Sequence, residues 1–532
     1  MWALHICFNK DNHLIMKKFL MAALLFAAAS LCSFAQDSPD FRVASVFSDH
    51  MVFQRDTLAP VWGWAEPGAK VTVTPSWDNK KYTATTDAQG RWEVYVQTPQ
   101  AGGPYSVKIV SKAGRIVLED VLSGEVWLCS GQSNMELPVI GASSQPVEGG
   151  VEAILSAGSF MDRIRVLNIK ADKKNEPQQD IDNHWELPDG PVTARTSAVA
   201  YFFARQLTES LGVPVGIICN PWGGCLIEPW MTREYIDAGV KGKIPEKAYQ
   251  DILDRRDDPS MPPIQMESMY NSRMYPIKGF AIKGFLWYQG CGNMYNYTFY
   301  DRLQQQMVRC WRDMWGDTED RLPFYFVSIA PFNYSDPSDP TRALFVENQL
   351  NSLDLIPNSG AAVTETLGEG TCIHPARKQE VARQLCLLAL ERTYSFTTGL
   401  GCGFPYPESV TFPSCSTVEE GEIRQSGFAV KIARSSADDG TITIVFANAS
   451  SGLGGFSDQL KNEGAPVHGF EVAGPDKVFH PVKAKALYNK VTVDCSGIGN
   501  PVALRYGFRN CSDADLKCVM GAPVPSFRTD SW

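Results

Sequence analysis

Short apolar segments alternate with helix-forming segments between residues 123 and 395. The apolar segments read EVWLCS, PVGIICN, GFLWYQG, PFYFVSIA and GAAVTET, and the helix-forming ones read SAVAYFFARQLTESLG, YDRLQQQMVRCWRDMWG and ALFVENQLNSL. Strands that alternate with helices predict a parallel sheet covered by helices on both faces. Such sheets place functional sites at the carboxyl ends of their strands, so the polar residues that follow the apolar segments are the first candidates.

The chain on either side of this region has a different pattern. Short alternating apolar and polar runs, separated by Gly, Pro and Asp turns, fill residues 40–122 and return after residue 400, as is typical of β-structure. A chain of 532 residues is also long enough for several domains. We therefore expect an N-terminal β-sandwich over 36–122, an α/β domain over 123–398 and a β-rich region over 399–532.

The first 35 residues resemble a signal peptide. Lys17 and Lys18 precede the apolar run FLMAALLFAAASLCSFA, and Ser33 and Ala35 are small residues suited to a cleavage site. The apolar run is too short to favour a membrane span. We therefore predict that the protein is exported, to the periplasm or the outside of the cell.

Charge and cysteine spacing limit the classes of partner. The formal net charge of −10 argues against nucleic acid or an anionic membrane surface. The cysteines are scattered, with no C-x-x-C pair and no His/Cys grouping spaced for zinc. We expect neither a metal nor an organic cofactor.

Ser133 is the first candidate for a catalytic residue. The apolar run that ends at Cys129 is followed by Ser-Gly-Gln-Ser-Asn, residues 130–134. A serine at a strand-to-helix turn exposes its hydroxyl beside backbone N–H groups that can stabilise an oxyanion. The sequence lacks the G-x-S-x-G motif of α/β-hydrolases. The alternative is that Ser133 only caps a helix.

A serine nucleophile needs a base, and His374 is the best placed histidine. It follows a strand-like run and precedes a helical pattern in HPARKQEVARQLCLLALERTY, where Pro375 suits the first helical position. Val381 and Leu385 recur there at helical spacing. His184, in DNHWE, is the second candidate, and a structural role is the alternative for either histidine.

Two further strand ends carry candidate binding groups. PVGIICN is followed by a turn containing Gly223, where the missing side chain lets a backbone N–H approach a ligand. GFLWYQG contains Gln289, which offers an amide donor beside aromatic rings. A tight turn and ordinary core packing are the alternatives at these two positions.

Together these segments resemble a known family. GEVWLCSGQSNMELPV, VPVGIICNPWGGCLIEPWM, IKGFLWYQGCGNM and IHPARKQEVARQL are similar, in this order, to motifs of the SGNH (GDSL-like) hydrolases, and specifically of the bacterial sialate O-acetylesterase family. The similarity extends to VFSDHMVFQR near the start and FRTDSW at the end. The resemblance implies a flavodoxin-like three-layer α/β/α fold with a parallel sheet.

The resemblance also implies roles for individual residues. Ser133 would attack an ester carbonyl, and His374 would take its proton and return it to the leaving sugar hydroxyl. The Ser133 and Gly223 N–H groups and the Gln289 side chain would form the oxyanion hole. The residues implied in substrate binding are Trp222, Tyr288 and Asn293, with Trp230 as a further candidate for stacking on a sugar. Core packing is the alternative for the aromatic residues, and support of its own loop is the alternative for Asn293.

The sequence departs from the family pattern at two acidic positions. The usual D-I-H-P reads Cys372-Ile-His-Pro here, and the usual Q-G-E-S has Cys291 in place of Glu. Either another acid, Glu369 or Glu365, orients His374, or the enzyme works as a Ser–His dyad, or the chain is a relative that only binds carbohydrate. A disulfide between Cys291 and Cys372 is a further hypothesis.

The function that we predict is an exported serine esterase that removes O-acetyl groups from sugars, as a sialate O-acetylesterase does. Its partner would be an O-acetylated carbohydrate. An acetyl esterase acting on plant polysaccharide such as xylan or pectin is the alternative within the same chemistry. Arg273 is the candidate for reading the carboxylate of a sialic acid, with a surface role as its alternative.

Overall fold

The computed structural model describes residues 41–170, 173–254, 265–396, 402–437, 439–449, 466–518 and 520–532. The expected signal peptide lies outside these residues. Within them, no helix is both long and apolar enough to cross a membrane.

The centre of the molecule is a parallel sheet with the spatial order β9-β10-β8-β11-β12-β13. Its strands are β8 (Gly114–Gly131), β9 (Ile164–Asn168), β10 (Val215–Pro221), β11 (Gly284–Tyr288), β12 (Phe324–Val327) and β13 (Ser359–Ala362). All five apolar segments predicted as strands are strands of this sheet. β9 escaped prediction because Arg165, which pairs with Asp120 at 2.9 Å, interrupts its apolar run.

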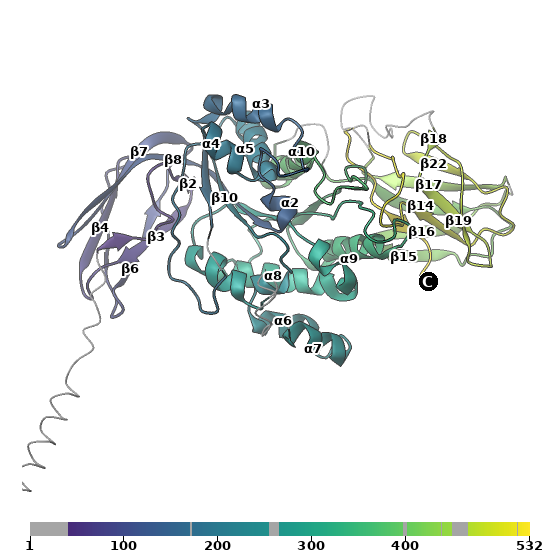
Figure 1. Ribbon diagram of the computed structural model, residues 1–532, viewed down its shortest axis with the longest axis horizontal. Helices are drawn as coiled ribbons and strands as arrows, with labels where there is room; N and C mark the ends of the chain where they lie inside the picture. Colours follow the sequence, from purple (N-terminus) through teal and green to yellow (C-terminus); the bar gives the residue numbers. More distant parts are fainter. Residues whose placement is uncertain are drawn as a thin grey trace, which may run out of the picture.

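Helices cover both faces of this sheet (Figure 1). α5 (Ala198–Leu211) and α10 (Lys378–Leu388) pack on one face, and α8 (Tyr300–Met314) and α9 (Thr341–Leu355) lie on the other. The shorter helices are α3 (Gly150–Leu155), α4 (Gly190–Arg195), α6 (Arg233–Val240) and α7 (Glu246–Asp254). The predicted α/β fold with a parallel sheet is confirmed.

The helix predicted to begin at Pro375 begins three residues later, at Lys378. The Ala376 N–H donates to Glu369 Oε1 at 2.7 Å, and Arg377 has a non-helical ψ of 53°. These contacts hold the segment after His374 as a turn. The prediction of Pro375 as the first helical residue is therefore wrong.

The N-terminal β-region is continuous with the central sheet. The first part of β8 pairs with β7 (Gly102–Ser111), while its last part lies between β10 and β11. The remaining N-terminal strands are β1 (Arg42–Val43), β2 (Val52–Gln54), β3 (Leu58–Trp64), β4 (Lys70–Pro75), β5 (Tyr82–Thr85) and β6 (Arg91–Gln97). The expected boundary after residue 122 therefore falls inside one strand, and one hydrophobic cluster extends across it.

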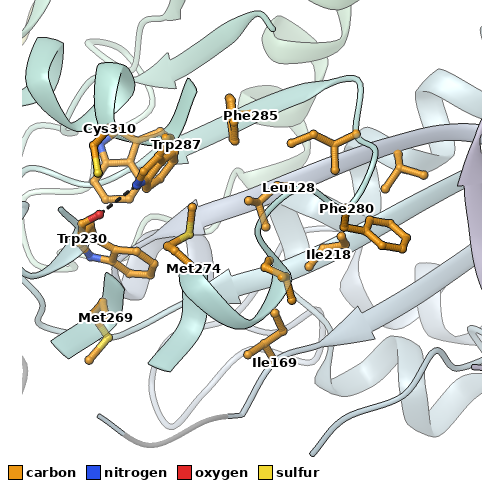
Figure 2. Packing of buried hydrophobic residues seen from close by; sticks show 14 of the residues in the cluster. Leu128, Ile169, Ile218, Trp230, Met269, Met274, Phe280, Phe285, Trp287 and Cys310 are labelled. Atoms are coloured by element: carbon orange, nitrogen blue, oxygen red, sulfur yellow. Dashed lines mark hydrogen bonds between the residues drawn. The ribbon is translucent and has the colours of Figure 1, made fainter. Parts of the chain in front are cut away.

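Aromatic side chains fill the space between the sheet and α8 (Figure 2). The rings of Trp230 and Trp287 meet edge to face at 5.6 Å, and Trp311 donates from Nε1 to the Trp230 carbonyl at 2.9 Å. Trp230 is fully buried. Its expected role in stacking on a sugar is therefore wrong, and it anchors the segment after β10 to the core.

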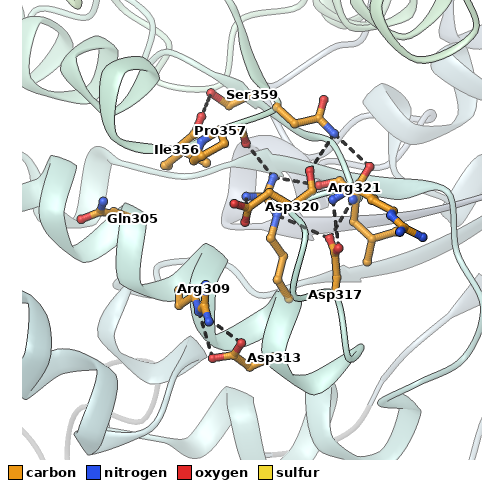
Figure 3. A network of polar contacts seen from close by, with 12 residues as sticks. Gln305, Arg309, Asp313, Asp317, Asp320, Arg321, Ile356, Pro357 and Ser359 are labelled. Atoms are coloured by element: carbon orange, nitrogen blue, oxygen red, sulfur yellow. Dashed lines mark hydrogen bonds and ion pairs between the residues drawn. The ribbon is translucent and has the colours of Figure 1, made fainter.

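A polar network lies at the amino-terminal ends of the parallel strands (Figure 3). The buried Arg312 of α8 donates to Asp320 at 2.8 Å and to the Pro357 carbonyl at 2.8 Å. Asp317 accepts from the backbone N–H of Arg321 at 2.9 Å. The network joins α8 to the loops that lead into β12 and β13.

The C-terminal region forms mostly antiparallel sheets with a hydrophobic core of their own. It lies at the end of the molecule opposite the N-terminal β-region (Figure 1). Arg528 joins it to α9 by an ion pair with Glu347 at 2.9 Å. Its strands are β14 (Tyr406–Phe412), β15 (Gly421–Gln425), β16 (Phe428–Arg434), β17 (Thr441–Ala447), β18 (Pro466–Val467), β19 (Phe470–Ala473), β20 (Phe479–Pro481), β21 (Ala484–Leu487), β22 (Lys490–Asp494), β23 (Ala503–Tyr506) and β24 (Phe527–Arg528).

Candidate active site

The site begins where β8 ends, at the point where the strand order reverses. Gly131 has a φ of 143°, and a side chain there would place Cβ 2.2 Å from the Tyr288 carbonyl of the neighbouring strand. Only glycine allows β8 to end this close to β11. The one-turn helix α2 (Ser133–Glu136) follows directly, with Gln132 as its N-cap residue. Ser133 is thus the first helical residue, and the capping alternative is wrong.

Ser133 and His374 lie together although they are 241 residues apart in the sequence. His374 Nε2 is 2.7 Å from Ser133 Oγ, which is the distance of a hydrogen bond. His184 is exposed, and the indole of the next residue, Trp185, donates to the Val46 carbonyl. The structure therefore places His374, and not His184, as the partner of Ser133.

Within the described residues, no acid is hydrogen-bonded to the other ring nitrogen of His374. Nδ1 is buried and has no hydrogen-bond partner among the described residues. Glu365 is held by Arg342 in two hydrogen bonds of 2.8 Å, and Glu369 accepts from the Ala376 N–H. The hypothesis that Glu365 or Glu369 orients His374 is therefore wrong in this geometry.

Backbone contacts hold the His374 segment in place of a carboxylate. The Cys372 thiol donates to the His374 carbonyl at 3.2 Å. Asn134, the residue after Ser133, donates from Nδ2 to the Ile373 carbonyl at 3.1 Å. The nucleophile helix is thus bonded directly to the residue before the imidazole.

Lys378 is a site residue that the sequence analysis missed. Its side chain is completely buried, and Nζ donates to Asn134 Oδ1. Burial lowers the pKa of Lys378 to about 7, against the opposing influence of Cys291, Cys372 and Glu369. The signal in the sequence that could have indicated Lys378 was its position four residues after His374, at the start of the predicted helix.

Burial also lowers the pKa of His374 below its usual value of 6.5, and the nearby Lys378 lowers it further. No carboxylate contributes in the opposite direction. The imidazole therefore stays neutral to a lower pH than usual, which is the state that a general base requires.

The oxyanion site differs from the expected one. In the described part of the chain, the Ser133 N–H is bonded to no acceptor. A Cβ at Gly223 would lie 3.8 Å from Ser133 Cβ, so this glycine borders the nucleophile. Gln289 is fully buried, and both of its amide hydrogens are used, by the Cys225 carbonyl at 3.1 Å and by Asn293 Oδ1 at 2.8 Å. The expectation that Gln289 donates to an oxyanion is therefore wrong.

Asn293 and Tyr288 are not placed to touch a substrate. Asn293 is buried, donates to Glu228 at 2.9 Å and accepts from the Ile227 N–H at 3.0 Å. Tyr288 is 1% exposed, and Lys378 lies over its ring at 5.5 Å. Both were expected to bind substrate, and both instead support the loops beneath the site.

Trp222 remains a candidate for contact with a sugar because its side chain is only half-buried. The guanidinium of Arg273 lies 4.6 Å from its ring. Arg273 is itself buried, and it donates to the carbonyls of Ile169 and Pro221 at 3.1 Å each. Arg273 therefore supports the Trp222 loop, and the expectation that it reads a substrate carboxylate is wrong.

Cys291 and Cys372, the two thiols at positions where the family has acids, are not joined. The hypothesis of a disulfide between them is therefore wrong for this structure. Cys291 is instead beside Tyr334 and Lys378, and burial raises the pKa of its thiol.

Glu136 is the second site residue that the sequence analysis missed. It lies three residues after Ser133 on α2, so the two side chains share one helical turn. A Cβ at Gly223 would be 2.6 Å from Glu136 Oε2. Burial raises the pKa of Glu136, while attraction to Arg273 and a hydrogen bond donated by the Gly223 N–H partly offset this.

Within the described residues, no group of three or more His, Cys, Asp or Glu is placed to hold a metal ion. The chemistry available at the site comes from a hydroxyl, an imidazole and backbone N–H groups. A serine–histidine pair at the carboxyl end of a parallel sheet is the arrangement that serine esterases use.

Comparison with known proteins identifies the family within this class. Residues 123–374 match the family described as carbohydrate esterase, sialic acid-specific acetylesterase. Human sialate O-acetylesterase is 30% identical over 405 residues, which cover 70% of this chain and 74% of the human one. The mouse enzyme is 29% identical over 404 residues, covering 66% of this chain and 74% of its own.

A solved structure extends the match to nearly the whole chain. The carbohydrate acetylesterase of Xanthomonas citri is 30% identical, with a TM-score of 0.74, over 92% of this chain and 100% of its own. The chain belongs to the sialic acid-specific acetylesterase family of carbohydrate esterases. It is a carbohydrate acetylesterase of the sialate O-acetylesterase-like kind.

Proposed function

We propose that this protein removes O-acetyl groups from sugars with a catalytic dyad of Ser133 and His374. The observation that carries the proposal is the 2.7 Å contact between Ser133 Oγ and His374 Nε2. Ser133 Oγ attacks the acetyl carbonyl carbon while Nε2 takes the hydroxyl proton. The ester C–O bond then breaks, and the imidazolium returns the proton to the leaving sugar oxygen. A water molecule releases acetate from the acyl-serine by the same steps.

The developing oxyanion is bound by the Ser133 N–H, and the Gly223 N–H, which contacts the Glu136 carboxylate in this structure, joins it when the substrate displaces that carboxylate. Both belong to turns at strand ends, so their orientation is fixed before the substrate binds. The donor expected from Gln289 is absent from this mechanism because its hydrogens are already bonded.

The dyad works without an orienting carboxylate. In serine proteases, loss of that carboxylate function lowers turnover by about 10⁴, and part of this loss reflects the wrong imidazole tautomer. Here the contacts of Asn134 and Cys372 to the His374 segment restrict the position of the ring. Acetyl esters are also more reactive than amides, so a dyad supplies a useful rate.

The test is hydrolysis of p-nitrophenyl acetate, followed by acetate release from acetylated mucin and acetylated xylan side by side. We expect Ser133→Ala to lower kcat by at least about 10³. Ser130→Ala is the matched control, because Ser130 lies in the same segment but its buried hydroxyl is bonded to none of the described residues. A Ser133→Ala variant with wild-type activity would overturn the proposal. Glycan binding by a wild-type protein without turnover would favour the binding-only alternative.

We also propose that the chain is exported and that residues 1–35 are removed. The support is the pair Lys17-Lys18 before an apolar run that ends in small residues. N-terminal sequencing of the protein secreted by its own cell tests this. A mature protein that still carries the apolar run would contradict it.

A further inference from the structure

A pocket lined by several basic side chains lies at the amino-terminal ends of the central strands, beside the network of Figure 3. Its volume is about 430 Å³, and it lies between the N-terminal β-region and the segments that lead into β11, β12 and β13. The acids in its lining are Asp56 and Glu125. The basic residues, which we call the basic pocket, are Arg55, Lys283, Arg321 and Arg392. In a chain with a net charge of −10, this local excess of positive charge favours binding of an anion.

Arg55 and Arg321 are paired with acids of the chain itself. Arg55 bonds the buried Glu125 and lies 4.0 Å from Asp56. Arg321 pairs with the exposed Glu319. Their charges are therefore balanced within the protein.

Lys283 and Arg392 are placed differently. Among the described residues, no carboxylate forms an ion pair with either side chain. Nζ of Lys283 lies 5.3 Å from the centre of the Tyr394 ring, and Arg392 donates to the Ser359 carbonyl at 2.7 Å. Neither side chain is buried, so both can be reached from solvent. These are the two cations that the basic pocket offers to an external anion.

A groove lined by aromatic rings continues from the basic pocket. It encloses about 1000 Å³, and its lining shares Thr57, Ile282, Arg321 and Leu322 with the pocket. Residues of β3 and β6 line one part of the groove, and residues of α6, α8 and the segment 270–282 line the rest. The aromatic residues of this lining that are not buried, which we call the aromatic groove, are Tyr95, Tyr235, Tyr270, Tyr275 and Trp315.

Polar groups lie beside these rings. The Tyr235 hydroxyl donates to Asp313 at 2.7 Å, and Nζ of Lys278 lies 3.7 Å from the centre of the Tyr275 ring. A sugar has an apolar C–H face that packs on an aromatic ring, and hydroxyls that bond neighbouring polar groups. The aromatic groove therefore suits sugar rings, and the basic pocket at its end suits a carboxylate.

We propose that the basic pocket and the aromatic groove form a second, non-catalytic binding site for an acidic oligosaccharide. Its carboxylate pairs with Lys283 and Arg392, and its neighbouring sugars pack on the rings of the groove. A small inorganic anion would use the basic pocket alone. A long polyanion such as nucleic acid is disfavoured, because two available cations neutralise few phosphates and the chain as a whole is negative.

This site is separate from Ser133 and goes beyond the ester hydrolysis proposed above. Lys283 directly precedes β11, whereas Ser133 lies beyond the carboxyl ends of the strands. A strand of five residues separates these two edges by roughly 15 Å. A glycan chain held at the second site raises the local concentration of its other sugars near the catalytic site.

Calorimetric titration of the full chain with sialyllactose, its carboxyl methyl ester and lactose tests the proposal. None of these probes carries an acetyl ester, so none is consumed. We expect sialyllactose to bind about tenfold more tightly than its methyl ester or lactose at about 20 mM salt. The double variant Lys283→Gln/Arg392→Gln should lower the affinity for sialyllactose by about tenfold and remove this preference.

Further variants separate the two parts of the site. Tyr95→Ala removes a ring that is 53% exposed and should weaken sialyllactose binding by about threefold. Lys112→Gln, which changes an exposed lysine between β7 and β8, should leave the affinity unchanged. Hydrolysis of p-nitrophenyl acetate at the wild-type rate shows that each variant is folded. With acetylated mucin, the double variant should show a raised KM and an unchanged kcat.

Two results would overturn the proposal. If the double variant binds sialyllactose as the wild type does, the ligand occupies another place, such as the catalytic site. If inorganic phosphate displaces sialyllactose and Tyr95→Ala has no effect, the basic pocket is only a site for small anions. The activity of Ser133→Ala, which tests the proposed function, bears on neither result, so the two proposals can fail separately.

Discussion

At the scale of single residues, the position of Cys372 decides how His374 is oriented. The thiol donates to the His374 carbonyl, while Nδ1 of the ring has no partner among the described residues. A carboxylate bonded to Nδ1 would fix the tautomer and stabilise the imidazolium that forms during catalysis. In the present arrangement the imidazole tautomer is fixed only indirectly, and no carboxylate among the described residues is bonded to Nδ1 to stabilise the imidazolium.

We therefore expect Cys372→Asp to raise kcat for p-nitrophenyl acetate by about tenfold or more. The new carboxylate should also raise the pKa of His374, so the acid limb of the pH–rate profile should move to higher pH. Cys372→Ser is the control, because it replaces the thiol without adding a charge. A Cys372→Asp variant with the rate and pH profile of the serine variant would contradict this account.

The pH dependence of the wild type follows from the environment of His374. Burial and the nearby Lys378 lower the pKa of His374 below 6.5. The base must be neutral, so activity is complete above this lowered pKa and is lost as the pH falls through it. We expect the acid limb of kcat/KM to lie below pH 6.5. Rates measured from pH 4.5 to 8 check this, and a limb at or above pH 6.5 would be inconsistent with it.

At the scale of secondary-structure elements, Lys378 connects α10 to α2 through Asn134. Its pKa is lowered from 10.5 to about 7 by burial. Between these two values the unfolded chain holds a proton that the folded chain has lost. The free energy of unfolding should therefore rise with pH in this window, by up to about 1.4 kcal/mol per pH unit.

Lys378→Met removes this titrating group and keeps an unbranched side chain of similar length. We expect the stability of the wild type relative to Lys378→Met to increase steadily from pH 7 to pH 9.5. Urea denaturation at several pH values measures the difference. Lys241→Met, which changes an exposed lysine, is the control. Parallel stability curves for wild type and Lys378→Met would show that the buried amine does not lose its proton.

The same elements show what the sequence could predict. Long apolar strands and helices of consistent period were found because burial on a parallel sheet dictates their pattern. β9 was missed because its buried Arg165 is paired in three dimensions, and the start of α10 was misplaced because Glu369 bonds the turn before it. Ser133 and His374 were found because strand ends converge. The sequence did not predict that the Gln289 amide is already hydrogen-bonded within the protein, because hydrogen-bond partners supplied by distant segments leave no local pattern.

At the scale of the whole molecule, β8 joins the N-terminal β-region to the catalytic sheet as one body. Glu125 lies in the middle of this strand with its side chain 1% exposed. It is held by Arg55 and by Gln54 at 3.0 Å from the N-terminal region, and by Tyr394 at 3.0 Å from the segment after α10. A buried carboxylate that takes its cation from one segment and hydrogen bonds from another makes the folding of these segments interdependent.

Arg55→Met tests this coupling. It leaves the Glu125 carboxylate buried without a cation, and we expect the free energy of unfolding to fall by about 2–3 kcal/mol, less than for a fully buried pair because Arg55 is partly exposed. The matched control is Arg42→Met, which breaks an exposed pair with Asp180 and should cost less than about 1 kcal/mol. Adding Glu125→Gln to Arg55→Met removes the unpaired charge and should restore most of the loss. Urea denaturation followed both by fluorescence and by residual esterase activity measures whether the two regions unfold together. Equal effects of the two arginine variants, or separate transitions for fluorescence and activity, would mean that the N-terminal region and the catalytic sheet are independent domains.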